Sequence, residues 1–226
     1  MKVASLTPRQ WLPDQVVAIK PHLKGWFHLA AAPLSLAAGI VLMALAPTPG
    51  LTWASAVYTA SSLILFGVSA AYNRIYWAPT WEMLMRRLDH SNINLLIAGT
   101  YTPLAVALLH GTDRVVLLSI VWAGALAGVL LAVLWPTAPR WLYTVLYILL
   151  GWVAVWYLPQ LWSAGGPAIV VLVIAGGILY TVGAVVYALK RPDPSPEWFG
   201  FHEIFHLFTI LAWACHCTAV YLAVLR

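Results

Sequence analysis

Two histidines one helical turn apart are the clearest chemical signal in the sequence. His202 and His206 belong to the segment His-Glu-Ile-Phe-His, which opens the last hydrophobic stretch of the chain. Residues at positions i and i+4 lie on one face of a helix, so these two imidazoles could hold one metal ion. Because ionisable groups are costly at the mouth of a membrane helix, their presence favours a functional site over simple capping.

The same segment matches the zinc-protease signature His-Glu-x-x-His, but its context differs. Only 20 residues follow His206, and His216 lies ten positions further on, about 15 Å along the same helix. A third ligand must therefore come from another segment. Glu203, rotated by about 100° from His202, is expected to face a neighbouring loop. The remaining histidines of the hydrophobic stretches are interpreted as packing or interfacial residues: His28, His110 and His216.

The composition indicates an integral membrane protein. Of the 226 residues, 62% are hydrophobic and 8% are charged, whereas about a quarter of the residues of soluble domains are charged. Apolar runs reach about 20 residues, the length that crosses a bilayer. Seven spans are predicted, at 26–47, 51–72, 88–109, 115–135, 141–158, 167–189 and 201–225. We therefore expect an all-α fold, a seven-transmembrane helix bundle that forms a single membrane domain over residues 1–226.

Basic residues mark one end of the predicted spans. Ten of the 12 lysines and arginines lie before the first span or in every second connection, against Arg114 and Arg226 on the other side. The positive-inside rule then predicts a cytoplasmic N-terminus, formed by residues 1–25, and a C-terminus outside. Residues 73–87, with tryptophans and leucines at helical spacing, are expected to form a loop or helix in the cytoplasmic interface. The net charge of +5 is thus a topology signal, and no nucleic-acid partner is expected.

This topology brings polar residues from three spans to one depth. They are Ser69 and Asn73 in span two, Asp89, His90, Asn92 and Asn94 in span three, and His202, Glu203 and His206 in span seven. Imidazoles and a carboxylate are ordinary zinc ligands, and a catalytic zinc site leaves one position for water. Asp89 could orient or deprotonate that water. The sequence therefore predicts a cytoplasm-facing zinc site.

Several segments resemble the hemolysin III family, whose relatives include the progestin and adiponectin receptors and, more distantly, the alkaline ceramidases. These segments are 20–28, 69–74, 88–93, 98–103, 199–206 and 214–216. The resemblance implies one zinc, bound by one histidine of span two and two of span seven, with a serine and an aspartate nearby. The span-seven pair corresponds to His202 and His206, the serine to Ser69 and the aspartate to Asp89. Some members of the family suggest ceramide amide hydrolysis, and others are described as receptors or haemolytic proteins.

The third histidine of that pattern would stand at position 73, where this chain has asparagine. An amide oxygen is a poor zinc ligand beside imidazoles. Three outcomes stay open. Asp89 completes the metal site with His202 and His206, or the neighbouring His90 compensates, or the site is weakened or empty.

Three functions are consistent with these residues. The first is a zinc-dependent hydrolase of a membrane-lipid amide or ester, with Asp89 and Ser69 as catalytic residues. The second is a non-catalytic membrane sensor or a subunit of a larger membrane complex, with a membrane-protein partner. The third is a haemolytic or pore-forming protein, which spans without a polar stripe do not favour. In each case we expect an integral protein of the bacterial plasma membrane with membrane lipids as partners.

Overall fold

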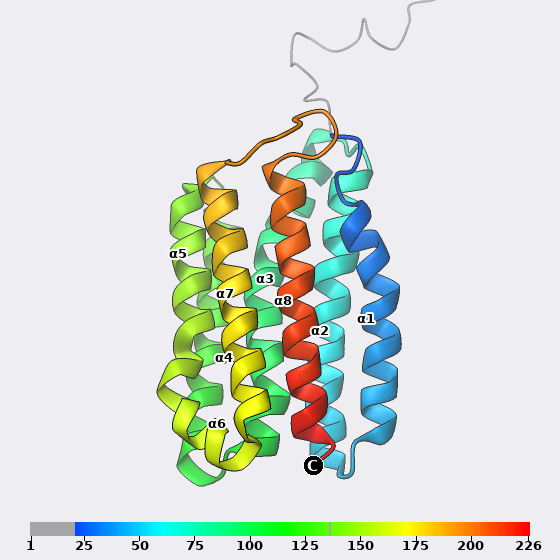
Figure 1. Ribbon diagram of the computed structural model, residues 1–226. Coiled ribbons are helices and arrows are strands. Elements are labelled where there is room, and N and C mark those ends of the chain that lie inside the picture. Colours follow the sequence, from blue (N-terminus) through cyan, green and yellow to red (C-terminus); the bar gives the residue numbers. More distant parts are fainter. Residues whose placement is uncertain (1–20, 136) are drawn as a thin grey trace, which may run out of the picture.

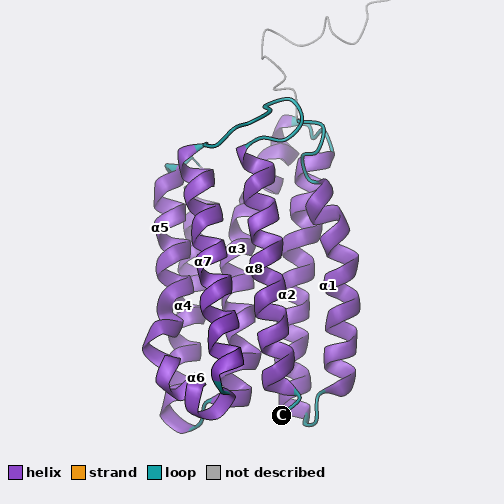
Figure 2. Cartoon of the chain, in the orientation of Figure 1, coloured by secondary structure: helices purple, strands orange, loops and turns teal. Residues whose placement is uncertain are grey.

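The chain folds into a bundle of helices that run side by side. The computed structural model describes residues 21–135 and 137–226. The elements are α1 (Trp26–Leu45), α2 (Pro49–Arg74), α3 (Pro79–Leu108), α4 (Gly111–Leu134), α5 (Arg140–Gly151), η2 (Trp152–Tyr157), α6 (Leu158–Gly165), α7 (Pro167–Leu189) and α8 (Phe201–Val224). Figure 1 shows their nearly parallel axes, and Figure 2 shows that the connections lie at the two ends of the bundle. The predicted all-α architecture is confirmed.

Short connections and proline-initiated helices produce this up-and-down arrangement. Proline occupies the first turn of α2, α3, α6 and α7, where its missing N–H costs no hydrogen bond. At α2, the Thr48 hydroxyl also accepts a 3.3 Å hydrogen bond from the Leu51 backbone N–H. Between α6 and α7, Gly166 has φ = +80°, a conformation that residues with a side chain rarely adopt.

Six helical segments are long and apolar enough to cross a bilayer, and they establish the chain as an integral membrane protein. They are α1, α2, α4, the segment Arg140–Gly165, α7 and α8. The seventh predicted span lies in α3, which is not one of these six segments. It carries charge in its first three turns, including Glu82, Arg86 and Asp89, and the polar Asn92 and Asn94 further on. However, α3 packs against α2, α4, α5, α6 and α8. A helix surrounded by other helices can carry polar residues that lipid would not tolerate.

The segment 73–87 contains both a connection and helix. α2 continues as far as Arg74, and residues 79–87 are the first turns of α3, continuous with the predicted third span. No glycine or proline lies between Pro79 and Gly99, so nothing in this stretch interrupts the helix once Pro79 has started it. The helical part of this segment therefore belongs to α3, and its place in the interface stays a prediction.

The fifth span changes from an α-helix to a 3-10 turn where the sequence predicts one α-helix. The Tyr101 hydroxyl of α3 donates to the Gly151 carbonyl at 2.6 Å and accepts from the Ala154 N–H at 2.8 Å. These bonds satisfy backbone groups where α5 gives way to the 3-10 turn η2. Pro159 lacks an N–H and begins α6 in a new register. The span extends to Gly165, seven residues beyond its predicted end at 158.

Glycines let helices approach closely inside the bundle. A Cβ atom at Gly124 of α4 would lie 2.7 Å from the Leu150 side chain of α5. Gly128, one turn later, is pressed against the side chain of Asn94 in α3. In α7, Gly176 accommodates the ring of His216. These contacts hold α4 and α7 against their neighbours.

The two ends of the bundle differ in charge. Figure 1 shows which helices begin and end at each of them. The end at which α1, α3, α5 and α8 begin carries, among the described residues, Lys24, Arg74, Arg86, Arg87, Arg140, Lys190 and Arg191. The opposite end carries Arg114 and Arg226. Lys2, Arg9 and Lys20, which entered the charge count, lie outside the described residues. We call the first of these ends the basic end.

Candidate functional site

The first turn of α8 is capped by its own glutamate. Gly200 is the N-cap, and its backbone N–H donates to Glu203 Oε2 at 2.8 Å. The Glu203 side chain is fully buried. This bond satisfies one of the N–H groups that every helix start leaves unpaired. Glu203, expected to face a neighbouring loop, thus stabilises the start of the helix that carries the two histidines.

His202 and His206 lie together at the basic end, as their spacing predicts. Their ring centroids are 4.5 Å apart with an angle of 63° between the ring planes. His206 is buried, whereas His202 is half-buried. The ring of His202 lies at the wall of a small cavity, and His206 points deeper into the bundle toward α1.

A third histidine joins this pair from α1. His28 is buried, and its ring stacks on that of His206 with a centroid distance of 3.7 Å and an interplanar angle of 14°. The sequence interpretation of His28 as a packing residue did not anticipate this contact. No local pattern reports it, because the partners are far apart in the chain. We call His28, His202 and His206 the histidine cluster.

Asn73, Ser69 and Asp89 lie near one another at the basic end. Asn73 Nδ2 donates to the Ser69 backbone carbonyl at 2.8 Å and to Ser69 Oγ at 3.3 Å. The Ser69 side chain is also a neighbour of the Asp89 carboxyl group. The Oδ1 atom of Asn73 is buried and has no hydrogen-bond partner. The structure therefore places the serine and the aspartate singled out from the sequence in one region.

A small cavity lies between Asp89 and His202. Asp89, His90 and His202 all contribute to its wall, together with Tyr143 and Tyr187. Its volume of about 20 Å³ is enough for one water molecule. Asp89, His90 and His202 therefore face one small space, whereas His206 is not part of its wall. Asn92 and Asn94 line neither this cavity nor the larger one described next.

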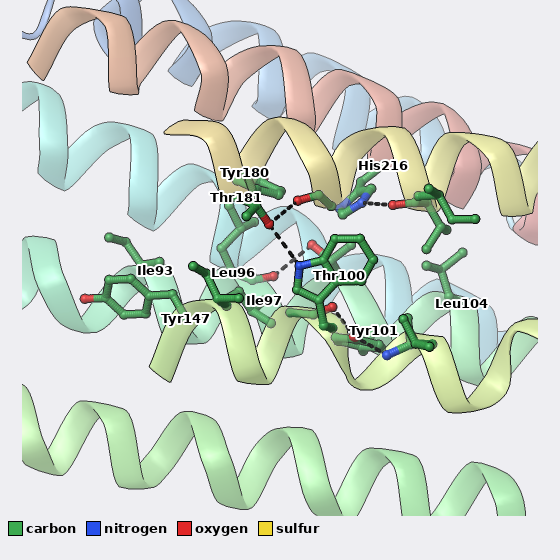
Figure 3. Close-up of a pocket in the computed structure, with 18 of the residues that line it drawn as sticks. Ile93, Leu96, Ile97, Thr100, Tyr101, Leu104, Tyr147, Tyr180, Thr181 and His216 are labelled. Carbon is green, nitrogen blue, oxygen red and sulfur yellow. Dashed lines mark hydrogen bonds between the residues drawn. The ribbon is translucent and has the colours of Figure 1, made fainter. Parts of the chain in front are cut away.

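A larger, apolar cavity of about 100 Å³ continues into the bundle. Figure 3 shows side chains of α3, α5, α7 and α8 around it, including Leu96, Leu104, Tyr180 and His216. Ile93, Tyr147, Ala184 and Phe205 belong to the walls of both cavities. The space beside Asp89 and His202 therefore adjoins a long pocket whose walls suit a hydrocarbon chain.

Charge is also present at the entrance to the cluster. Lys24 lies directly before α1, and burial lowers the pKa of its ammonium group from the usual 10.5. The carboxylates of Glu203 and Asp89 act in the opposite direction and favour the charged form. Two backbone hydrogen bonds tie this segment to the connection before α8, from His22 to Glu197 and from Leu23 to Trp198.

The donor atoms can be tested against the zinc expected from the sequence. Both ring nitrogens of His28, Nε2 of His202 and Nδ1 of His206 are buried without a hydrogen-bond partner. Such imidazole nitrogens are ordinary zinc ligands. Among the described residues, no three His, Cys, Asp or Glu side chains are already placed around one point as a metal-ligand set. The chemistry of the donors fits zinc, and binding would require the rings to turn.

Comparison with known proteins identifies the family of the chain. The sequence profile described as "Haemolysin-III related" matches residues 17–217. The chain belongs to this family. It is 33% identical to "Hemolysin-3" of Bacillus cereus over 186 residues, which cover 81% of this chain and 82% of the relative. It is also 33% identical to the "Hemolysin-3 homolog" of Bacillus subtilis (strain 168) over 172 residues, 74% of this chain and 80% of the relative. The resemblance inferred from the motifs is confirmed.

Proposed function

We propose that this haemolysin-III family protein is a membrane-embedded, zinc-dependent hydrolase that cleaves an amide or ester bond of a membrane lipid. The proposal includes α3 as the seventh membrane span, with the basic end of the bundle in the cytoplasm of a bacterial cell, as the positive-inside rule favours. Under this orientation the histidine cluster and Asp89 lie near the cytoplasmic face.

The junction of the two cavities is the observation that carries the proposal. The small cavity has room for one water between an aspartate and a histidine, and the adjoining pocket is lined by hydrocarbon and aromatic side chains. A lipid whose acyl chain occupied the long pocket would bring its first carbonyl carbon to that water. The shared wall residues Ile93 and Ala184 would then lie beside the head of the chain.

Each polar residue has a defined task in this proposal. His202 and His206 would hold zinc, which when bound supplies a Lewis acid and lowers the pKa of its water to about 7. Asp89 accepts a proton from the attacking water and returns it to the leaving group. Ser69 orients the Asp89 carboxylate through its hydroxyl, and Asn73 fixes Ser69. The apolar pocket excludes bulk water from the acyl chain.

Fatty-acid release from defined lipids tests this function. The detergent-purified full chain would be mixed with an N-acyl sphingosine or a phosphatidylcholine in micelles, and zinc content would be measured on the same samples. Asp89→Asn should lower kcat by about 100- to 10,000-fold, the usual value of a lost general base. His202→Ala/His206→Ala should lose both zinc and activity.

His110→Ala provides the matched control for the histidine substitutions. His110 is exposed at the start of α4, at the opposite end of the bundle. This variant should keep the zinc content and the activity of the unmodified chain. A protein that binds zinc but releases no fatty acid from either lipid class would contradict hydrolysis as the function.

A non-catalytic sensor or subunit is the second candidate, and Asn73 favours it. Its amide nitrogen is committed to Ser69, at the position where the family resemblance expects a metal-binding histidine. The same pocket would then hold a lipid as a signal rather than as a substrate. The name of the Bacillus relatives suggests membrane lysis, but the apolar lining of the long pocket does not favour an ion-conducting path.

A further inference from the structure

His28 is held against both the α8 histidines and the site of the missing ligand. α1 packs against α2 and α8. Its N-cap residue, Gly25, has φ = +81°, and a Cβ atom there would lie only 2.9 Å from Asn73 Cβ. His28 lies three residues later, on the same face of the helix start. One face of α1 therefore touches Asn73 with Gly25 and His206 with His28.

The hydrogen-bond state of His28 distinguishes it from the structural histidines of the bundle. The ring of His216 is also deeply placed, but its Nε2 is paired with the Val173 carbonyl at 3.1 Å. The exposed His110 pairs with Arg114. His28 has neither nitrogen paired, although its side chain is 2% exposed. Because buried polar groups normally have partners, an unpaired imidazole in this position points to a ligand.

We propose that His28 supplies the third imidazole of the metal site. It takes the role of the histidine that the family resemblance expects at position 73, where this chain has asparagine. This inference rests on the proposed zinc site and assigns its ligands as His28, His202 and His206. Asp89 then remains free to act on water instead of binding the metal.

The rings need only a local rearrangement to reach this state. His28 and His206 are stacked with nearly parallel planes, whereas nitrogen lone pairs lie in the ring planes and must converge on a metal. Rotation about χ2 of a histidine is broad and has a low barrier, so His28 can turn its edge toward His202 and His206 without moving α1.

Zinc binding by the full chain in detergent tests the assignment. Metal would be removed with a chelator, and Zn²⁺ affinity would be measured by titration, with Co²⁺ absorption as a report of ligand number. In His28→Phe the aromatic contacts with His206 and Phe66 are kept but no ligating nitrogen remains. We expect this variant to bind zinc at least about 100-fold more weakly, whereas Asp89→Asn should stay within about 10-fold, the effect of losing a group outside the ligand set.

A rescue variant guards against a simple folding defect. His28→Phe/Asn73→His returns a histidine to the α2 position and should recover zinc binding. Wild-type zinc affinity in His28→Phe would overturn the assignment, and loss of zinc in Asp89→Asn alone would give the third position to Asp89. If the unmodified chain binds no zinc, the proposed function fails together with this inference. If the unmodified chain binds zinc and His28→Phe binds it equally well, only this inference fails, so the two failures are distinguishable.

Discussion

Removing the Tyr101 hydroxyl should destabilise the bundle by breaking the connection between α3 and the interrupted fifth span. In Tyr101→Phe the Gly151 carbonyl loses a donor at 2.6 Å and the Ala154 N–H loses an acceptor at 2.8 Å. Tyr101 and Ala154 are both buried. The substitution therefore removes two hydrogen bonds between α3 and the backbone of the fifth span in an apolar interior.

The size of the effect follows from hydrogen bonds measured inside membrane proteins. Such bonds average about 0.6 kcal/mol and reach about 1.7 kcal/mol, so the two bonds together should contribute about 1–3 kcal/mol. For a chain of this length, 1 kcal/mol corresponds to about 2–4 °C in Tm. We expect Tm to fall by about 4–8 °C for a loss of about 2 kcal/mol.

Thermal unfolding in a single detergent, followed by tryptophan fluorescence, measures this shift. Tyr180→Phe is the matched control, because Tyr180 is another tyrosine in the wall of the long pocket whose buried hydroxyl has no partner. Its removal should be neutral or slightly stabilising. Equal Tm values for the two variants would refute the reasoning, since only the hydrogen bonds distinguish them.

Three further outcomes are expected. Gly128→Ala should cost about 1–3 kcal/mol because its Cβ collides with Asn94, whereas Gly67→Ala, with open space around it, should be tolerated; thermal unfolding compares them. Asn73→His should raise zinc affinity by about 10-fold or more, because it adds an imidazole to those of His28, His202 and His206, and equilibrium titration would show no change if position 73 lies outside the site. Ala184→Phe should fill the junction of the two cavities, so that lipid hydrolysis falls while zinc content is kept; undiminished hydrolysis would mean that the substrate lies elsewhere.

Hydrophobic runs and charge placement were sufficient to predict the bundle and most of its span boundaries. The exceptions have physical causes that local patterns do not contain. The end of the fifth span was placed at 158, whereas the helical segment runs to Gly165. The apolar run also gives no sign that the Tyr101 hydroxyl would stabilise a 3-10 turn after Gly151. For the segment 73–87 the sequence left loop and helix open, because its charges conceal the fact that the helix started by Pro79 continues into the bundle.

The candidate site was predicted where its residues share a helix face and missed where contact depends on packing. The i, i+4 spacing predicted that His202 and His206 would lie together, and Asp89 lines the same small cavity as His202. His28 was overlooked because nothing in its neighbourhood distinguishes a packing histidine from one stacked on α8. A signal was available in Gly25, since a glycine before a helix permits close approach of another segment.

The polar character of α3 has a consequence for the assembly of the protein in the cell. Among the described helical segments of at least 18 residues, α3 alone falls short of the apolarity that lets a helix partition into lipid by itself. Its neighbours α2 and α4 are both apolar enough to do so. During synthesis α3 should therefore wait at the translocation channel until α4 emerges, and the two should enter the bilayer as a hairpin packed on α2. Chains truncated before residue 111 should accordingly leave α3 accessible to water-soluble labelling reagents, and chains that extend through α4 should protect it.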